Sequence, residues 1–212
     1  MDKKSLVNVS WHKFLGTVLE EWLTEVRITV QTDFLIGSEP PRGDILLLRN
    51  QCSRWNKKQR ERLPDGIRDS NASHVLLEFK YSESINRDAF LQTLGYDNQY
   101  RKVQRLKEHQ LQSFIFSSKT TQSKLLLDYV YYLTYQDGIY QSYNILLRSI
   151  LLISINELPD TLGNIPLKFF ASKQSERRKS FEAFKEGRLK KISPKLEWLL
   201  HGLRKIFTLK GE

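Results

Sequence analysis

The stretch His74-Val75-Leu76-Leu77-Glu78-Phe79-Lys80 decides the fold, because its length and apolar composition are typical of a buried strand. Successive side chains of a strand point to opposite faces, so Glu78 and Lys80 share one face. Leu77 and Phe79 point the other way, into a core. A carboxylate and an ammonium group are costly to bury unless they are paired or metal-bound. The pattern therefore indicates either a cross-strand ion pair or a functional site.

A second acid precedes another apolar stretch. Gly43-Asp44 opens the expected strand Asp44–Leu48. If this strand lies beside the first, Asp44 meets Glu78, and two carboxylates with a backbone carbonyl suit Mg²⁺ or Mn²⁺. The alternative is that Asp44 only ends the turn formed by residues 39–43.

Two expected helices carry further polar candidates. Apolar residues at spacings of three and four predict a helix over residues 11–26, on which Glu20 either reaches a metal through water or is simply solvated. A second helix is expected over residues 86–109. Gln92 and Tyr96, four residues apart, share one of its faces. They either contact a phosphate and position Lys80, or Tyr96 packs while Gln92 faces water.

The remaining pattern predicts strands over residues 28–36 and 113–117 and a mostly β region over 125–155, with a turn at 136–138. Helices are expected over 175–186 and from Ser193-Pro194 onward. This alternation predicts an α/β (α+β) fold with a mixed central sheet flanked by helices. The strands 28–36, 44–48, 74–81 and 113–117 are expected at the centre of that sheet.

The charge balance points to a polyanionic partner. The chain has 212 residues, with 34 Lys and Arg against 24 Asp and Glu, which gives a net charge of +10. The candidate phosphate contacts cluster in two basic stretches, with Trp55 as a candidate for base stacking. They are Arg54, Lys57, Lys58, Arg60 and Arg62 in the first and Arg177, Arg178 and Lys179 in the second. The alternative for each is ordinary solvated surface.

Other classes are disfavoured. The single cysteine, Cys52, allows no internal disulfide. The first ten residues lack the apolar segment of a signal peptide. The most apolar run, residues 145–155, contains Arg148 and is too short to span a bilayer. These features predict a cytoplasmic protein with no membrane partner.

Four motifs in order resemble the PD-(D/E)XK nuclease superfamily. They are G-x-x-x-E at Gly16–Glu20, G-D at Gly43-Asp44, E-x-K at Glu78–Lys80 and Q-x-x-x-Y at Gln92–Tyr96. The last is similar to the motif of the RecB-like branch. The resemblance spans somewhat under half of the chain, from Leu15 to Tyr100.

The resemblance implies a restriction-endonuclease-like core over residues 1–120, with an inserted basic loop at 50–73. Residues 121–212 would add a β-rich continuation and two C-terminal helices to the same domain. It also implies Mg²⁺- or Mn²⁺-dependent hydrolysis of phosphodiester bonds in DNA, and homodimers are common among such nucleases. Asp44 and Glu78 would hold the metal with help from Glu20, and Lys80, Gln92 and Tyr96 would complete the catalytic group.

One departure leaves a rival acid. The gap between Asp44 and Glu78 is long for the superfamily, and Asp65 lies at a more usual distance from Glu78. Asp44 is preferred because it lies on an apolar strand, whereas Asp65 lies in a Pro-Asp-Gly turn that favours Asp for its own reasons.

Two other classes of function stay open. One is a non-catalytic nucleic-acid-binding module on the same fold, whose acids bind no metal productively. The other is an interaction protein with a chance Glu-x-Lys sequence, which would bind DNA no better than its charge alone predicts.

Overall fold

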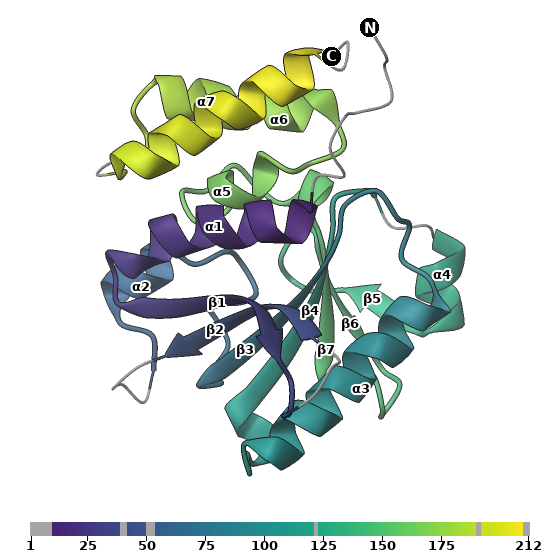
Figure 1. Cartoon of the computed structure of the whole chain (residues 1–212). Helices are drawn as coiled ribbons and strands as arrows, with labels where there is room; N and C mark the ends of the chain where they lie inside the picture. The colour runs from purple at the N-terminus through teal and green to yellow at the C-terminus, as the bar shows by residue number, and fades with distance from the viewer. Residues whose placement is uncertain (1–9, 39–41, 50–53, 121–122, 190–191, 210–212) are drawn as a thin grey trace, which may run out of the picture.

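The computed structural model describes residues 10–38, 42–49, 54–120, 123–189 and 192–209. Its centre is one seven-stranded mixed sheet with the order β1-β2-β3-β4-β7-β6-β5 (Figure 1). The strands are β1 (Ile28–Leu35), β2 (Arg42–Arg49), β3 (His74–Lys80), β4 (Leu111–Ser117), β5 (Tyr131–Leu133), β6 (Ile139–Ser142) and β7 (Ile150–Ser154). β3, β4 and β7 run parallel to one another, and the neighbours on either side pair antiparallel.

Helices cover both faces of this sheet (Figure 1). On one side lie α1 (Trp11–Thr24), α5 (Ile165–Lys168), α6 (Gln174–Lys185) and α7 (Pro194–Leu209), and on the other α3 (Arg87–Val103) and α4 (Ser123–Asp128). The short helix α2 (Lys57–Arg62) packs near the C-terminal end of α1, and the 3₁₀ turns are Glu108–Gln110 and Ile155–Glu157. None of the described helices is long and apolar enough to cross a bilayer.

The strand β3 divides its side chains between two cores. Val75, Leu77 and Phe79 join the large cluster under α1, α5 and α7, whereas Leu76 joins a smaller cluster under α3. Burying each such side chain stabilises the fold by about 1.5–3 kcal/mol. Glu78 therefore lies on the α3 face, in phase with Leu76.

The first helix approaches the sheet closely. A Cβ added to Gly16 would lie 2.3 Å from the hydroxyl oxygen of Thr32 on β1, so only glycine fits there. The structure thus gives Gly16, the first residue of the G-x-x-x-E motif, a packing role.

Most predicted elements are confirmed, with four differences. β1 is an edge of the sheet and not part of its centre. The helix expected to reach residue 109 ends at Val103, and Arg105 adopts a positive φ of 54° soon after it. The inserted basic loop expected at 50–73 contains the helix α2, which begins at a capping box formed by Asn56 and Gln59. The expected 125–155 strands are present, but α4 overlaps the start of that region.

Candidate active site

The register of two strands brings the two predicted acids together. Ile45 of β2 pairs with Leu77 of β3, so Asp44 and Glu78, the next residues, lie opposite each other. Asp44 Oδ2 also accepts a hydrogen bond of 2.8 Å from the backbone N–H of Phe79. That bond fixes the Asp44 carboxylate at the end of β3.

A chain of polar contacts leads from these acids to α3. Lys80 Nζ lies 2.9 Å from Glu78 Oε1 and 3.3 Å from Gln92 Oε1. Gln92 Nε2 donates to the hydroxyl of Tyr96 over 2.7 Å. Of the two α3 side chains, Gln92 contacts the lysine and Tyr96 contacts Gln92, while Tyr96 also packs against the smaller cluster under α3.

The helix is held in place for this role. Asn86 caps its N-terminus by accepting a hydrogen bond from the backbone N–H of Ala89. Near its middle, the buried Asp97 accepts a 2.7 Å hydrogen bond from Ser113 of β4 and pairs with Arg101. These contacts fix the rotation of α3, and with it the direction of Gln92.

Asp44, Glu78, Lys80 and Gln92 line an open cleft of about 410 Å³. Its lining residues come from the N-terminal end of α1, the ends of β2 and β3, the loop after β3 and the start of α3. They are Ser10, Trp11, His12, Asp44, Glu78, Phe79, Lys80, Tyr81, Ser82, Glu83 and Gln92.

Burial dominates the electrostatics of the cleft. It raises the pKa of Glu78 to about 7, the Asp44 charge adds to this rise, and Lys80 opposes it. It also raises the pKa of Asp44, against the Phe79 hydrogen bond and the Lys80 charge. For Lys80, burial is outweighed by the Glu78 carboxylate, which raises the lysine pKa. Two carboxylates that repel each other in a partly desolvated cleft favour a bound cation.

One buried oxygen is left for such a cation. Glu78 is only 2% exposed, and its Oε2 has no hydrogen-bond partner among the described residues. An orphaned carboxylate oxygen is costly unless an ion or ordered water satisfies it. No three His, Cys, Asp or Glu side chains within the described ranges converge on one point. Two acids still fit Mg²⁺, which usually keeps several waters and binds one or two carboxylates together with phosphate oxygens.

His12 is a member of the cleft that the sequence did not single out. Its Nδ1 lies 3.9 Å from Asp44 Oδ1, and burial lowers the pKa of the imidazole, which favours the neutral, ligating form. His12 lies in the first turn of α1, eight residues and about 12 Å of helix before Glu20. The helix singled out from the sequence therefore reaches the cleft, but at its other end.

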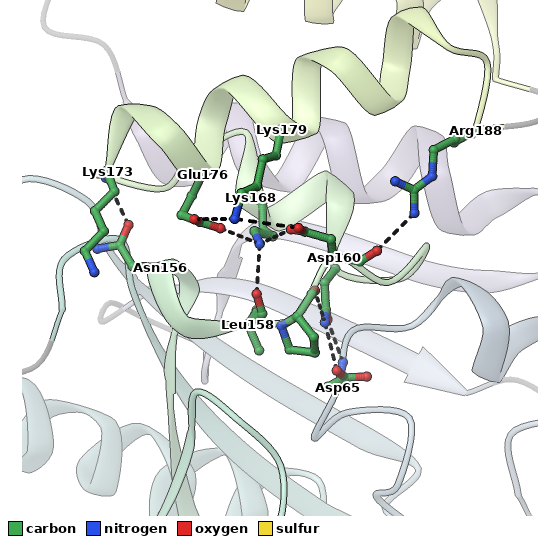
Figure 2. Close-up of polar contacts among 11 residues, drawn as sticks. Asp65, Asn156, Leu158, Asp160, Lys168, Lys173, Glu176, Lys179 and Arg188 are labelled. Atoms are coloured by element: carbon green, nitrogen blue, oxygen red, sulfur yellow. Dashed lines mark hydrogen bonds and ion pairs between the residues drawn. The ribbon is translucent and has the colours of Figure 1, made fainter.

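The structure does not bring Glu20 or Asp65 to the cleft. Glu20 is exposed and is not among the cleft residues. Asp65 is 7% exposed and pairs at 2.5 Å with Arg68. It also accepts a 2.8 Å hydrogen bond from Asn164, a contact drawn in Figure 2. Asp44 therefore faces Glu78, and Asp65 ties its turn to the segment before α5.

The basic candidates divide into engaged and exposed side chains. Arg60 pairs with Asp69, and Arg62 pairs with Glu25 and lies over the ring of Trp22. Arg54, Lys57 and Lys58 are exposed.

Two of the proposed nucleic-acid contacts are corrected. Trp55 is only 5% exposed and belongs to the core, so it is not available for base stacking in this conformation. Arg177 is 4% exposed and donates to the carbonyl oxygens of Ala171 and Ser172. Its neighbour Lys179 is bound to Glu176, whereas Arg178 is exposed.

No family model, curated protein or solved structure matches this chain.

Proposed function

We propose that this protein is a Mg²⁺- or Mn²⁺-dependent deoxyribonuclease that hydrolyses phosphodiester bonds at the Asp44–Glu78–Lys80 cleft. The observation that carries the proposal is the buried, unpartnered Oε2 of Glu78 beside a second carboxylate and a lysine in an open polar cleft. A plain ion pair would satisfy Glu78 through Lys80 alone and would not need Asp44 opposite it.

Each residue has a distinct role in this proposal. Asp44 and Glu78 would hold the metal ion, and His12, whose Nδ1 lies 3.9 Å from Asp44 Oδ1, would orient that carboxylate. When bound, the ion lowers the pKa of a water and offsets charge on the scissile phosphate. Lys80 keeps its proton, because its pKa is raised, and donates a hydrogen bond to the developing phosphate charge. Gln92, itself held by Tyr96, keeps the ammonium group aimed into the cleft.

DNA is the proposed substrate because the chain as a whole is strongly basic, although its cleft holds two acids. A net charge of +10 attracts the phosphate backbone over a distance, whereas the two acids alone would repel it. A metal ion between the acids removes that local repulsion. Polyanion and metal are therefore expected to bind cooperatively.

The test is a cleavage assay on single-stranded, double-stranded and branched DNA with each metal. Asp44→Asn keeps the shape of the side chain and should abolish cleavage. Asp128→Asn is the matched control, because Asp128 is exposed on α4 and is not among the residues that line the cleft. Cleavage that persists in Asp44→Asn, or its absence from the unaltered protein, would contradict the proposal.

The second candidate is a nucleic-acid-binding module without activity. The absence of a third carboxylate or imidazole converging on the acids, within the part of the chain that the structure describes, favours weak metal binding. A protein that binds DNA but shows no Mn²⁺-dependent shift in melting temperature would be assigned to this class.

A further inference from the structure

A second hollow lies between α6 and α7, beside the acidic cleft. This α6–α7 groove has a volume of about 280 Å³, and its lining combines two aromatic rings, four cations and one carboxylate, that of Glu182. The rings are Phe181 and Phe207, and the cations are Arg177, Arg178, Lys185 and Arg204. The groove is thus opposite in charge to the cleft.

Stacked aromatic rings join the groove to the cleft. Trp11, which lines the cleft, stacks on Tyr81 with ring centroids 4.0 Å apart and an interplanar angle of 22°. Trp11 also stacks on Phe207 of the groove at 5.9 Å and 10°. This aromatic contact therefore links the two hollows. The C-terminal end of α7 accordingly reaches the N-terminal end of α1 (Figure 1).

The cations of the α6–α7 groove are of two kinds, one buried and held by the protein and the others exposed. Arg177 is 4% exposed, donates to two backbone carbonyls and lies 4.6 Å above the ring of Phe207. Arg178 and Lys185 are exposed and form no ion pair with any residue that the structure describes. A ligand can therefore bind these two charges without breaking an ion pair within the described part of the protein.

The charged residues of α6 that lie outside the groove are paired within the protein. Lys168, 1% exposed, pairs with Glu176 and Asp160 and donates to the carbonyl of Leu158, while Lys179 pairs with Glu176 (Figure 2). The charges of α6 on that side are thus satisfied within the protein. Among the described residues of α6, Arg178 and Lys185 are the cations without an ion pair, and both line the groove.

This combination suits an unpaired nucleic-acid strand. Proteins that bind single strands combine a positively charged groove along the backbone with aromatic rings on which bases stack. The rings open to a base here are the half-buried Phe181, Trp11 and Tyr81, because Phe207 is 5% exposed and packs in the core. A duplex hides its base faces and would use only the cations.

We propose that the α6–α7 groove binds the backbone of a single-stranded DNA segment whose adjoining nucleotide crosses the Trp11–Tyr81 pair into the acidic cleft. The proposal rests on the proposed function for its choice of DNA. It adds a strand path and a preference for substrates with an unpaired tail.

The test measures binding without cleavage, in EDTA, by anisotropy of fluorescein-labelled dT16. Arg178→Glu/Lys185→Glu should weaken binding of dT16 and lower the salt slope by about 1.4, since each lost single-strand contact removes about 0.7. Lys102→Glu/Lys124→Glu is the control, because it makes the same change in charge at exposed sites on α3 and α4. The control should keep the wild-type slope.

Two further arms identify the strand. A single-stranded tail should strengthen binding of a blunt duplex to the unaltered protein, and the groove variant should lose that gain. Binding of dT16 should also quench tryptophan emission, and Trp11→Phe, which keeps a ring in the stack, should remove most of the quenching.

An equal loss of affinity in the groove and control variants would overturn the proposal. So would a tail that adds no affinity, or quenching that survives in Trp11→Phe. Because these measurements need neither metal nor turnover, they are independent of the nuclease test. Normal cleavage with an inert groove would place the strand elsewhere, whereas groove binding without cleavage would remove only the enzymatic proposal.

Discussion

Lys80 Nζ donates to Glu78 Oε1 over 2.9 Å and leaves Glu78 Oε2 buried and unpartnered. Both side chains project from the same face of β3, two residues apart. The lysine thus neutralises one oxygen of the carboxylate while the other stays available for a ligand. A cation in the cleft would share Glu78 with Lys80 without displacing it.

The first prediction distinguishes the proposed role of Glu78 as a metal ligand from that of Lys80 as a hydrogen-bond donor to the phosphate. Glu78→Gln should lose Mn²⁺ binding, since an oxygen ligand with full charge is gone. Lys80→Met removes a competing positive charge, so Mn²⁺ should bind as well or more tightly. Cleavage should nevertheless fall by about 10²–10³-fold in Lys80→Met, the usual cost of losing one donor to transition-state charge. Isothermal titration with Mn²⁺ and a cleavage assay on the same preparations measure both effects.

Parallel losses of metal affinity in both variants would contradict this assignment. The lysine would then be part of the metal site's architecture and not a donor beside it.

The second prediction concerns the first helix. His12→Asn should lower cleavage by about 10–100-fold, the usual cost of removing a group that supports a metal ligand. Glu20→Gln should change cleavage little, because Glu20 is exposed and outside the cleft. Initial rates at saturating Mn²⁺ compare the two. A larger loss from Glu20→Gln than from His12→Asn would restore the sequence-based choice of Glu20.

Part of the candidate site could be predicted from the sequence, and part of it could not. Period-two alternation predicted that Glu78 and Lys80 share one face, because that signal is local. Asp44 was expected beside Glu78 only if their strands are neighbours, and the β2–β3 pairing meets that condition. His12 was missed because its value depends on which end of α1 meets β2, a matter of tertiary packing. Trp55 and Arg177 were misread for the same reason, since a basic or aromatic side chain in a polar stretch does not reveal its own burial.

The third prediction concerns the exposed lysines of α2. α1 is 14 residues long, and α2 packs at its far end, so these lysines lie about 21 Å from the cleft along the helix. A duplex in the cleft must extend about six base pairs to reach them, at about 3.4 Å per pair. Lys57→Ala/Lys58→Ala should therefore lower the salt slope of binding by about 1.8 on longer duplexes, at about 0.9 per contact.

Arg60→Ala provides the comparison on the same helix. Its guanidinium is already paired with Asp69 at 2.9 Å, so its loss should change the slope less than the loss of either lysine. Filter binding at several salt concentrations gives the slopes. An unchanged slope in the double lysine variant would remove α2 from the interface.

The last prediction concerns acid stability and the buried Lys168. Burial opposes ionisation of Glu176, but hydrogen bonds from Lys168 and Lys179 outweigh it and hold the Glu176 pKa below its ordinary value of 4.5. A carboxyl group with a lowered folded-state pKa stabilises the fold fully above its unfolded pKa, and that contribution is lost as pH falls through the lower folded value. Wild-type melting temperature should therefore drop as pH falls below about 4.5.

Glu176→Gln should start from a lower melting temperature at neutral pH, because removing one partner leaves Lys168 less compensated, and should show a shallower drop in acid. Melting curves of both proteins from neutral pH downward check this, and parallel acid limbs would show that another carboxyl group sets the stability in acid.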